Sequence, residues 1–389
     1  MGRFADVLAG PGLGAIAEIK RRSPSLGDIR PDADPGLLAA AYARAGAAAV
    51  SVLVDERFGG TWDDLRAARA SSGVPLLAKG FFSTEEHLRT AKEAGADAAL
   101  LLLRDLDDGQ AASLLALAGE LGLETLVEAH DAEELRRAAA LRAPVIGINA
   151  RDLSTFEVDR AAQLDLVADS NYLPHRPVVV AESGIRTRAQ GAAAELAGAH
   201  AILVGSALMQ APDPAGKLRE LLARPLVKVC GLTREEDVAV AAGAGADLAG
   251  FVLAPESPRA AREVLPVPDE LLAVAVWVGA AGPSDAPVDQ VHERAEGAVR
   301  GRDAVLLRDG EQVARLLDLP WEAEDPGHWD RAASTPGRIV LAGKLAADNV
   351  GEAIRRVRPW AVDASSRLET APGIKDPAKV RAYVKAARA

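Results

Sequence analysis

A glutamate and a lysine stand two residues apart in the apolar stretch "AIAEIK", residues 15–20. Residues two apart on a β-strand point to the same face, so Glu18 and Lys20 would project together. A buried charge needs a partner, which favours a Glu/Lys pair that points into a ligand site. Lys79, at the end of "VPLLAK", and Glu128, in "LVEAH", supply a second cation and a second carboxylate. Such a set can tune proton donors against acceptors, although ordinary structural ion pairs are the alternative.

The elements that must position these residues are short apolar strands separated by helices. Stretches such as "DPGLLAAAYARAGA", "TEEHLRTAKEAGA" and "DAEELRRAAALRA" have helical periodicity. Eight apolar runs alternate with such stretches in the first half: "AIAEIK", "AAVSVLV", "VPLLAK", "DAALLLL", "ETLVEAH", "PVIGIN", "VVVAES" and "AILVGS". Apolar strands that alternate with helices indicate a parallel sheet, and eight such units close a (β/α)8 barrel. A doubly wound open sheet is the weaker alternative.

Polar or small residues stand where each strand run ends. In a parallel barrel these ends meet on one rim, where the active sites of this fold lie. They are Glu18, Lys20, Ser51, Asp55, Lys79, Glu128, Asn149, Glu182, Ser183, Gly205 and Ser206. Gly184, and Gly205 with Ser206, follow the seventh and eighth runs, where barrels commonly bind phosphate through backbone N–H groups. Tight turns are the alternative reason for these glycines. We expect a phosphate monoester as substrate.

The composition limits the partners and the compartment. The chain has 389 residues, enough for two domains, and a formal net charge of -11 at pH 7. Nucleic-acid binding needs a basic face, so we expect no nucleic-acid partner. No run is long enough to span a membrane, no signal peptide is recognisable, and the one cysteine fits a reducing compartment. We expect a cytoplasmic protein that binds small molecules and has no metal site. The sequence does not fix the oligomeric state, and a monomer is compatible with it.

The strand pattern restarts after Pro225 with "LVKVCG", which predicts a boundary between residues 1–223 and residues 224–389. Strand-like runs in the second half are "LVKVCG", "LAGFVLA", "LAVAVWVG", "DAVLLR", "RIVLAG" and "WAVDAS", with "VARLLD" a doubtful seventh. This half is shorter than the roughly 200 residues of a complete barrel. We therefore predict an α/β fold of two tandem (β/α)8 TIM barrels, the second shortened and either complete or missing one βα unit.

The motifs of the first half resemble, in order, those of indole-3-glycerol phosphate synthase over nearly all of residues 4–210. They are "AEIKRRSPSLG", "SVLVDERFGGTWDDL", "VPLLAKGF", "LVEAH", "IGINARDLSTFEVD", "AESGI" and "LVGSAL". That family acts in tryptophan biosynthesis. It closes the indole ring of 1-(o-carboxyphenylamino)-1-deoxyribulose 5-phosphate with loss of carbon dioxide and water. The resemblance implies this carboxy-lyase activity, without a cofactor, for the first barrel.

The resemblance also implies roles for the rim residues. Lys79 would be a general acid in ring closure and dehydration, and Glu128 the other acid–base group. Lys20, oriented by Glu18, would hold the substrate carboxylate and share in proton transfer. Further contacts implied are Asn149 and Glu182 with hydroxyls, Arg151 beside the anthranilate ring, Phe58 packed on it, and Ser23, Ser183, Gly184, Gly205 and Ser206 with phosphate and substrate. Lysine acids near a carboxylate that must leave suit a decarboxylating condensation.

The sequence departs from the synthase family at three places. Gly80 stands where the family usually has Asp, and Ala150 replaces the second Asn of its "INNRDL" motif. The family also has a longer N-terminal segment that forms a helix over the barrel mouth, whereas this sequence starts almost at the first strand. We expect either a misassigned start codon or a missing lid, and a missing lid would weaken substrate binding.

The second half resembles phosphoribosylanthranilate isomerase in "KVCGLTREEDVAVAAGAGADLAGFVLAPESPRAAREV", "RIVLAGKLAADNV" and "VDASSRLETAPGIKD". That family catalyses the preceding step, an Amadori rearrangement, which needs one acid and one base. The resemblance implies that Cys230 is the base and that Arg259 binds the anthranilate carboxylate. Asp318 is the best match to the acid, and Asp363 is the alternative. A lone cysteine is otherwise most often a buried packing residue.

Two other interpretations of the whole chain stay open. The second half can be a noncatalytic scaffold or interaction module on a monofunctional synthase. Alternatively, the chain is a pair of phosphate-binding barrels that act on another sugar phosphate. The tandem order of the two resemblances favours a bifunctional enzyme of tryptophan biosynthesis.

Overall fold

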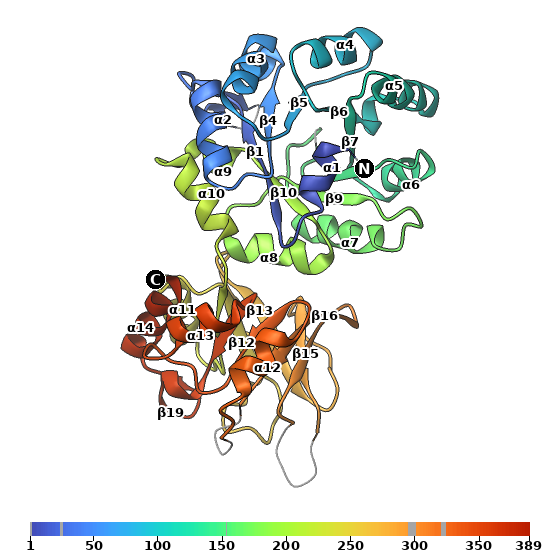
Figure 1. Ribbon diagram of the computed structural model, residues 1–389. Helices are drawn as coiled ribbons and strands as arrows, with labels where there is room; N and C mark the ends of the chain where they lie inside the picture. The colour runs from blue at the N-terminus through green and yellow to red at the C-terminus, as the bar shows by residue number, and fades with distance from the viewer. Residues whose placement is uncertain (1, 24–25, 153, 295–300, 320–323) are drawn as a thin grey trace. The chain divides into compact units, whose positions relative to one another are not determined.

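The computed structural model divides the chain into two compact units, each with a closed barrel of eight strands (Figure 1). The first unit comprises Met1–Arg186 and Ala194–Leu222, and the second Thr187–Ala193 and Ala223–Ala389. The structure describes residues 2–23, 26–152, 154–294, 301–319 and 324–389. Pro24, Ser25 and Leu153 of the quoted motifs, and residues 320–323 just after Asp318, lie outside the described residues.

The first barrel contains all eight strands predicted from its apolar runs, and all eight pairings are parallel. The strands are β1 (Gly14–Ile19), β4 (Ala49–Leu53), β5 (Leu76–Lys79), β6 (Ala98–Leu102), β7 (Glu124–Ala129), β8 (Val145–Asn149), β9 (Val178–Glu182) and β10 (Ala201–Val204). A small hairpin of β2 (Arg22–Ser23) and β3 (Gly27–Asp28) follows β1. The (β/α)8 prediction for this half is confirmed.

The helices of the first barrel begin where the sequence supplies capping residues. The side chain of Asp34 accepts a hydrogen bond from the N–H of Leu37, and Pro35 occupies the first helical position. The helices are α1 (Arg3–Leu8), α2 (Pro35–Arg44), α3 (Trp62–Ser71), α4 (Glu85–Glu93), α5 (Asp108–Glu120), α6 (Ala132–Ala140), α7 (Arg160–Ser170), α8 (Arg188–Ala197), α9 (Ser206–Gln210) and α10 (Pro214–Leu222), with the 3-10 turns η1 (Glu56–Phe58) and η2 (Leu103–Asp105). Within the described residues of the chain, no helix has the length and apolar character of a membrane span.

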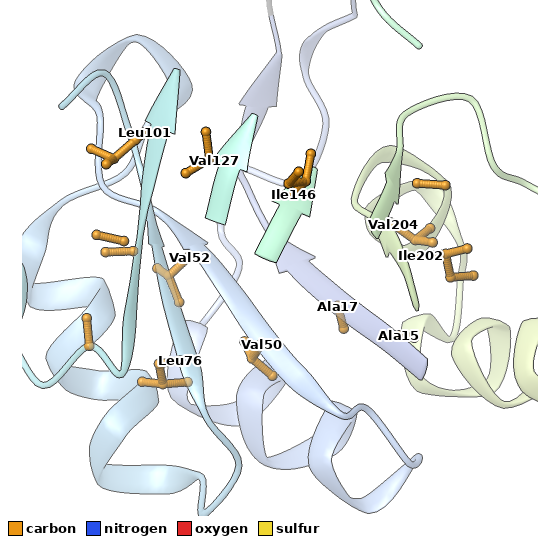
Figure 2. Packing of buried hydrophobic residues seen from close by; sticks show 14 of the residues in the cluster. Ala15, Ala17, Val50, Val52, Leu76, Leu101, Val127, Ile146, Ile202 and Val204 are labelled. Atoms are coloured by element: carbon orange, nitrogen blue, oxygen red, sulfur yellow. The ribbon is translucent and has the colours of Figure 1, made fainter. Parts of the chain in front are cut away.

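Two apolar layers pack against the two faces of the first barrel's strands. The outer layer lies between strands and helices and includes Ala17, Val52 and Val127 (Figure 2). The inner layer fills the barrel, and four of its members stand two residues before a charged residue on the same strand face. These pairs are Ile16 and Glu18, Leu77 and Lys79, Leu126 and Glu128, and Val180 and Glu182. The four charged side chains therefore project inside the barrel at the carboxyl ends of its strands, as the two-residue spacing predicted for Glu18.

Helix α1 closes the other end of the barrel. Phe4 and Leu8 are fully buried and belong to the inner apolar layer. The N–H groups of Phe4 and Ala5 donate to the carboxylate of Glu124, the first residue of β7. Because the amino ends of the strands lie opposite the predicted site, this short helix is a plug at the bottom of the barrel and not a lid. The sequence analysis did not predict this helix, because it placed the first strand almost at the start of the sequence.

The second barrel also closes with eight strands, so its strand ring does not miss a unit. They are β11 (Leu226–Cys230), β12 (Leu248–Val252), β13 (Leu272–Val278), β14 (Val288–His292), β15 (Ala304–Arg308), β16 (Glu311–Leu317), β17 (Ile339–Leu341) and β18 (Ala361–Ala364). The six predicted strands and the doubtful "VARLLD" are all present. The sequence analysis missed β14, whose buried positions include Gln290 and His292.

The second half reaches eight strands in fewer residues because, in its described part, fewer helices connect the strands. Its helices are α11 (Glu235–Gly243), α12 (His328–Ser334), α13 (Val350–Val357) and α14 (Pro377–Arg388), and the loop after β18 carries η3 (Ser366–Leu368), β19 (Glu369–Ala371) and β20 (Ile374–Lys375). Among the described residues, no helix lies between α11 and α12. Strand β15 pairs antiparallel with both β14 and β16, because parallel pairing needs a long crossover. The strand ring of the second barrel is therefore mixed, with β15 antiparallel to its two neighbours.

Candidate active sites

Lys79 is the centre of the charged cluster in the first barrel. Its Nζ lies 2.6 Å from Glu182 Oε2, 3.5 Å from Glu18 Oε2 and 3.6 Å from Glu128 Oε2. Lys20 Nζ lies 2.8 Å from Glu18 Oε1. All three carboxylates are buried, and each comes from a different strand. The structure thus brings together the acid–base residues that the sequence placed on separate strands.

The cluster shifts the pKa of each member through burial and neighbouring charge. Burial disfavours the ionised form of Glu128, but Lys79 and His130 outweigh it and lower the pKa of Glu128 to about 2. Burial dominates at Glu182 and, with repulsion from Glu128, raises its pKa to about 8 against the attraction of Lys79. Burial also opposes the charged form of Lys79, but the three glutamates hold its pKa above the usual value. Lys79 is therefore protonated, and Glu182 can share a proton near neutral pH.

Two glycines make room for these carboxylates. A Cβ on Gly205 would lie 2.2 Å from Glu18 Oε1, and a Cβ on Gly147 would lie 2.1 Å from Glu182 Oε1. Any side chain at either position would displace a charged residue of the cluster. Gly205 therefore has a packing role beside the phosphate contact that the resemblance implies. Among the described residues, Glu182 Oε1 is buried without a hydrogen-bond partner. Because buried polar atoms are normally hydrogen-bonded, this oxygen is a candidate acceptor for a ligand group.

His130 is a member of the site that the sequence analysis did not single out. Its Nε2 lies 3.2 Å from Glu128 Oε1, and its Nδ1 lies 3.0 Å from Glu134 Oε2. Burial disfavours the imidazolium, but the two carboxylates outweigh it and raise the pKa of His130 to about 10. Asn149 Nδ2 donates to the same oxygen of Glu128 at 2.9 Å. Only the "LVEAH" motif hinted at His130, because the six histidines are scattered along the sequence.

The predicted ligand contacts after β8 and β9 lie beside the cluster. The Arg151 N–H donates to Asn149 Oδ1 at 2.9 Å, and Arg151 Nη1 donates to the carbonyl of Phe156 at 2.9 Å. Ser183 and Gly184 follow Glu182 and both have positive φ, 69° and 71°. For Ser183 this conformation is uncommon and marks a backbone held by its surroundings.

The remaining predicted contacts occupy other loops of the same rim. Ser23, in β2, is buried, and its Oγ accepts from the N–H of Leu26 at 3.2 Å. Ser206 is the first residue of α9 and follows Gly205 directly. Phe58 ends η1 and stacks on Phe81, with ring centroids 6.3 Å apart. Phe81 is a second aromatic residue at this position that the sequence analysis did not assign.

The lack of a side chain at Gly80 has a steric explanation in this chain. A Cβ at this position would lie 2.7 Å from Cε1 of Phe82. Phe82 stacks on Trp62 with ring centroids 5.7 Å apart. The aspartate that the family usually has here would therefore require the ring of Phe82 to move.

In the second barrel, Cys230 ends β11 beside a buried lysine. Lys228 Nζ lies 2.6 Å from Gln290 Oε1 and 2.9 Å from Asp363 Oδ2. Burial raises the pKa of the Cys230 thiol, and the positive charge of Lys228 opposes that rise. Asp363, the alternative acid, is thus paired with Lys228. The sequence analysis assigned no role to Lys228 or Gln290.

Asp318 lies directly after β16, on the same rim as Cys230. Strand β16 is parallel to β17, β17 to β18, and β18 to β11, so the carboxyl ends of β11 and β16 point the same way. Two strands separate β11 from β16 around the ring, which places Cys230 and Asp318 on different sides of the mouth. Asp318 is buried, and its backbone N–H donates to Asp303 Oδ1 at 3.2 Å.

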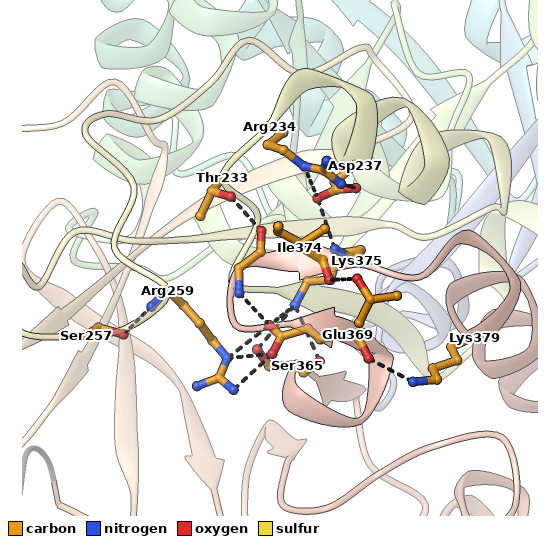
Figure 3. Close-up of polar contacts among 12 residues, drawn as sticks. Thr233, Arg234, Asp237, Ser257, Arg259, Ser365, Glu369, Ile374, Lys375 and Lys379 are labelled. Atoms are coloured by element: carbon orange, nitrogen blue, oxygen red, sulfur yellow. Dashed lines mark hydrogen bonds and ion pairs between the residues drawn. The ribbon is translucent and has the colours of Figure 1, made fainter.

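Arg259 forms a two-pronged ion pair in the same mouth. Its Nε donates to Glu369 Oε1 at 2.9 Å and its Nη2 to Glu369 Oε2 at 2.9 Å (Figure 3). Lys375 Nζ donates to Glu369 Oε1 at 2.7 Å. Sequence reasoning identified Arg259 but neither of these partners, whose contacts depend on a loop more than 100 residues away.

Comparison with known proteins gives matches to both halves. The family model of indole-3-glycerol phosphate synthase matches residues 3–221, and that of N-(5'phosphoribosyl)anthranilate (PRA) isomerase matches residues 327–386. The indole-3-glycerol phosphate synthase of Paenarthrobacter aurescens (strain TC1) is 44% identical over 212 residues, which are 54% of this chain and 77% of that protein. The solved structure of TrpF from Jonesia denitrificans is 30% identical with a TM-score of 0.34, and the match covers 42% of this chain and 97% of that one.

One relative matches nearly the whole chain. The tryptophan biosynthesis protein TrpCF of Salmonella typhi is 36% identical over 419 aligned residues, covering 96% of this chain and 88% of that protein. The synthase family model alone covers more than half of the chain. The chain therefore belongs to the bifunctional tryptophan biosynthesis proteins, in which an indole-3-glycerol phosphate synthase comes before a phosphoribosylanthranilate isomerase.

Proposed function

We propose that the first barrel closes the indole ring of 1-(o-carboxyphenylamino)-1-deoxyribulose 5-phosphate at the Lys79 cluster. The observation that carries this proposal is one lysine whose Nζ lies within 3.6 Å of the side-chain oxygens of three buried glutamates from three strands. Ring closure, loss of carbon dioxide and dehydration need a proton donor at the carbonyl and an acid–base partner for the leaving hydroxyl. The cluster supplies both without a cofactor.

Each member of the cluster has a distinct part in this reaction. Lys79 donates a proton to the carbonyl oxygen as the ring carbon attacks. Lys20, held by Glu18, binds the carboxylate that leaves as carbon dioxide. In the dehydration, Glu128, kept ionised by Lys79 and His130, accepts the proton that the substrate loses, and Lys79, reprotonated after ring closure, protonates the hydroxyl that leaves as water. Asn149 and Glu182 bind substrate hydroxyls, and Ser183, Gly184, Gly205 and Ser206 contact the phosphate.

Substitution of the central lysine tests the synthase proposal. Lys79→Met should lower kcat for ring closure by about 100-fold or more, because it removes the proton donor of the cluster. The control is Lys92→Met, which removes a lysine whose Nζ donates to the carbonyl of Gly122 on the helical surface. Ring closure by Lys79→Met at the rate of the control would exclude this site.

For the second barrel we propose Amadori isomerisation of N-(5'-phosphoribosyl)anthranilate. Asp318 protonates the furanose ring oxygen as the ring opens, and Cys230, as thiolate, removes the proton from C2. Lys228 favours the charged form of Cys230 and so opposes, without cancelling, the burial that raises the pKa of the thiol. The closed strand ring, with Cys230 and Asp318 on one rim, supports catalysis over the scaffold interpretation.

An isosteric substitution of the proposed acid tests the isomerase. Asp318→Asn should abolish isomerisation and leave ring closure of supplied 1-(o-carboxyphenylamino)-1-deoxyribulose 5-phosphate unchanged. Asp363→Asn is the comparison variant, since it breaks the pair with Lys228. Full isomerase activity in Asp318→Asn would show that a residue other than Asp318 is the general acid.

We further propose that the functional domains are residues 1–223 and 224–389, since the strand pattern restarts at Leu226. A cytoplasmic location and a monomer fit small phosphorylated substrates and an acidic chain of net charge -11. The same net charge supports the absence of a nucleic-acid partner.

A further inference from the structure

Three loops of the second barrel meet around Arg259 and Glu369 (Figure 3). Thr233, in the loop after β11, donates through Oγ1 to the carbonyl of Gly373 at 2.6 Å. Arg259, in the loop after β12, reaches Glu369 in the loop after β18. A Cβ on Gly231, the residue after Cys230, would lie 3.0 Å from Cδ of Arg259. The stem of Arg259 therefore packs against the backbone that carries the proposed base.

Glu369 holds Arg259 along one edge of the guanidinium. The carboxylate accepts from Nε and Nη2, with distances of 2.9 to 3.1 Å. A guanidinium has five N–H donors in a rigid plane, so this side-on pairing leaves the edge formed by the terminal nitrogens for a second carboxylate. The Glu369 side chain is only 5% exposed, whereas that of Arg259 is 26% exposed. The buried partner thus fixes the plane of the exposed one.

A carboxylate beside Arg259 would by itself cancel the charge that a substrate carboxylate needs. Lys375 compensates for this effect, because its Nζ lies 2.7 Å from Glu369 Oε1 and its side chain is fully buried. The three groups together keep one positive charge. Lys379 Nζ also donates to the backbone carbonyl of Glu369 at 2.8 Å, which fixes the loop from the other side.

We infer that Glu369, held by Lys375, is a positioning residue that orients Arg259 to bind the anthranilate carboxylate of the isomerase substrate. The inference rests on the proposed isomerase function. It makes Glu369 and Lys375 determinants of specificity for substrates whose aromatic ring carries a carboxylate. Neither residue touches the reacting atoms in this account.

The test is steady-state kinetics of isomerisation by the full chain with two substrates. One is N-(5'-phosphoribosyl)anthranilate, and the other is N-(5'-phosphoribosyl)aniline, which lacks the carboxylate. Glu369→Gln should raise KM for the first about tenfold, the size expected for a misaligned charged hydrogen bond, with little change in kcat. It should leave KM for the second within about twofold, because Arg259 has no carboxylate to bind there.

Three further tests keep the experiment decisive. Glu369→Gln combined with Lys375→Met removes the buried lysine as well, so the same KM pattern can be read if the single variant does not fold. Glu256→Gln is the matched control, since Glu256 lies in the loop of Arg259 but pairs with the exposed Arg294 at 3.5 Å. In an Arg259→Lys background, Glu369→Gln should have no further effect on KM.

Two results would overturn the inference. An equal rise in KM with both substrates would show that Glu369 supports the fold alone, and an unchanged KM would show that Arg259 needs no positioning. Absence of isomerase turnover in the unsubstituted chain would instead contradict the proposed isomerase function, and this inference with it.

Discussion

At the scale of single residues, a histidine stands behind Glu128, the proposed acid–base glutamate of the first barrel. Glu134 and Glu128 face the two ring nitrogens of His130, and the imidazolium in turn stabilises ionised Glu128. Lys79 faces the same carboxylate from the other side. Lys79 and His130 thus both favour the ionised form of Glu128, which its proposed role as a base requires.

His130→Asn should raise the pKa of Glu128 from about 2, because it removes one of the two cations that favour ionisation. A base must be ionised, so the acidic limb of the kcat profile for ring closure should move to higher pH. We expect a shift of about one unit, equivalent to about 1.4 kcal/mol. His175→Asn is the control, because His175 Nε2 contacts the carbonyl of Ala143 at the opposite end of the barrel. Identical pH profiles for wild type and His130→Asn would contradict this role.

The sequence could identify the charged residues of the Lys79 cluster but not the residues that support them. Glu18, Lys79 and Glu128 stand at strand ends and are recognisable from their spacing alone. His130 and Glu369 act through contacts that only the folded chain creates, the latter with an arginine 110 residues away. Gly147 could not be recognised from the sequence as part of the site, because it has no side chain and its role is to leave space for Glu182.

At the scale of elements, helix α1 acts as a plug for the first barrel. Phe4 and Leu8 fill the inner layer between the amino ends of the strands, and Glu124 caps the helix through the N–H groups of Phe4 and Ala5. The sequence concealed this role because six residues are too few for a recognisable helical period. The plug supports the strands from below while the site opens at the other end.

Phe4→Ala should destabilise the first barrel by about 3 kcal/mol, since it leaves a cavity in the inner layer. Hydrogen exchange followed by mass spectrometry reports the barrels separately, and peptides from β1 and β7 should exchange faster. Val7→Ala on the same helix is the control, because Val7 is 37% exposed and should change stability by at most about 0.5 kcal/mol. Equal exchange in the two variants would show that α1 is dispensable.

On one side of the second barrel, strands β14, β15 and β16 pair antiparallel instead of being joined by helical crossovers. Strand β14 escaped prediction because its buried face includes Gln290 and His292 and so lacks an apolar run. Asp309 and Gly310 join β15 to β16 and both have positive φ, 50° and 81°, as in the primed turns of tight hairpins. The reversal at this turn returns β16 to the direction of β11, which brings Asp318 to the rim of Cys230.

Gly310→Ala should destabilise the second barrel by about 1 kcal/mol through backbone strain alone, since an added Cβ would meet no atom within 4 Å. Scanning calorimetry should show a lower melting temperature. Gly351→Ala, inside α13, is the control with the opposite sign, because alanine favours a helix interior more than glycine. A melting temperature unchanged by Gly310→Ala would rule out the tight turn.

At the scale of the whole molecule, two barrels on one chain carry two chemically distinct sites. The first concentrates lysines and glutamates for a condensation with loss of carbon dioxide, and the second sets a thiol and a carboxyl on different sides of its mouth. The repeated strand pattern was enough to predict two barrels. The number of helices in the second could not be predicted, because hairpins and crossovers can close the same ring.

The most direct test measures both reactions on the purified intact chain and on two variants. Wild type should convert N-(5'-phosphoribosyl)anthranilate to indole-3-glycerol phosphate through both steps. Lys79→Met should stop at 1-(o-carboxyphenylamino)-1-deoxyribulose 5-phosphate, whereas Cys230→Ser should lose isomerisation and still close the ring of that intermediate when it is supplied. Undiminished isomerisation by Cys230→Ser would contradict the account of the second barrel, and undiminished ring closure by Lys79→Met would contradict that of the first.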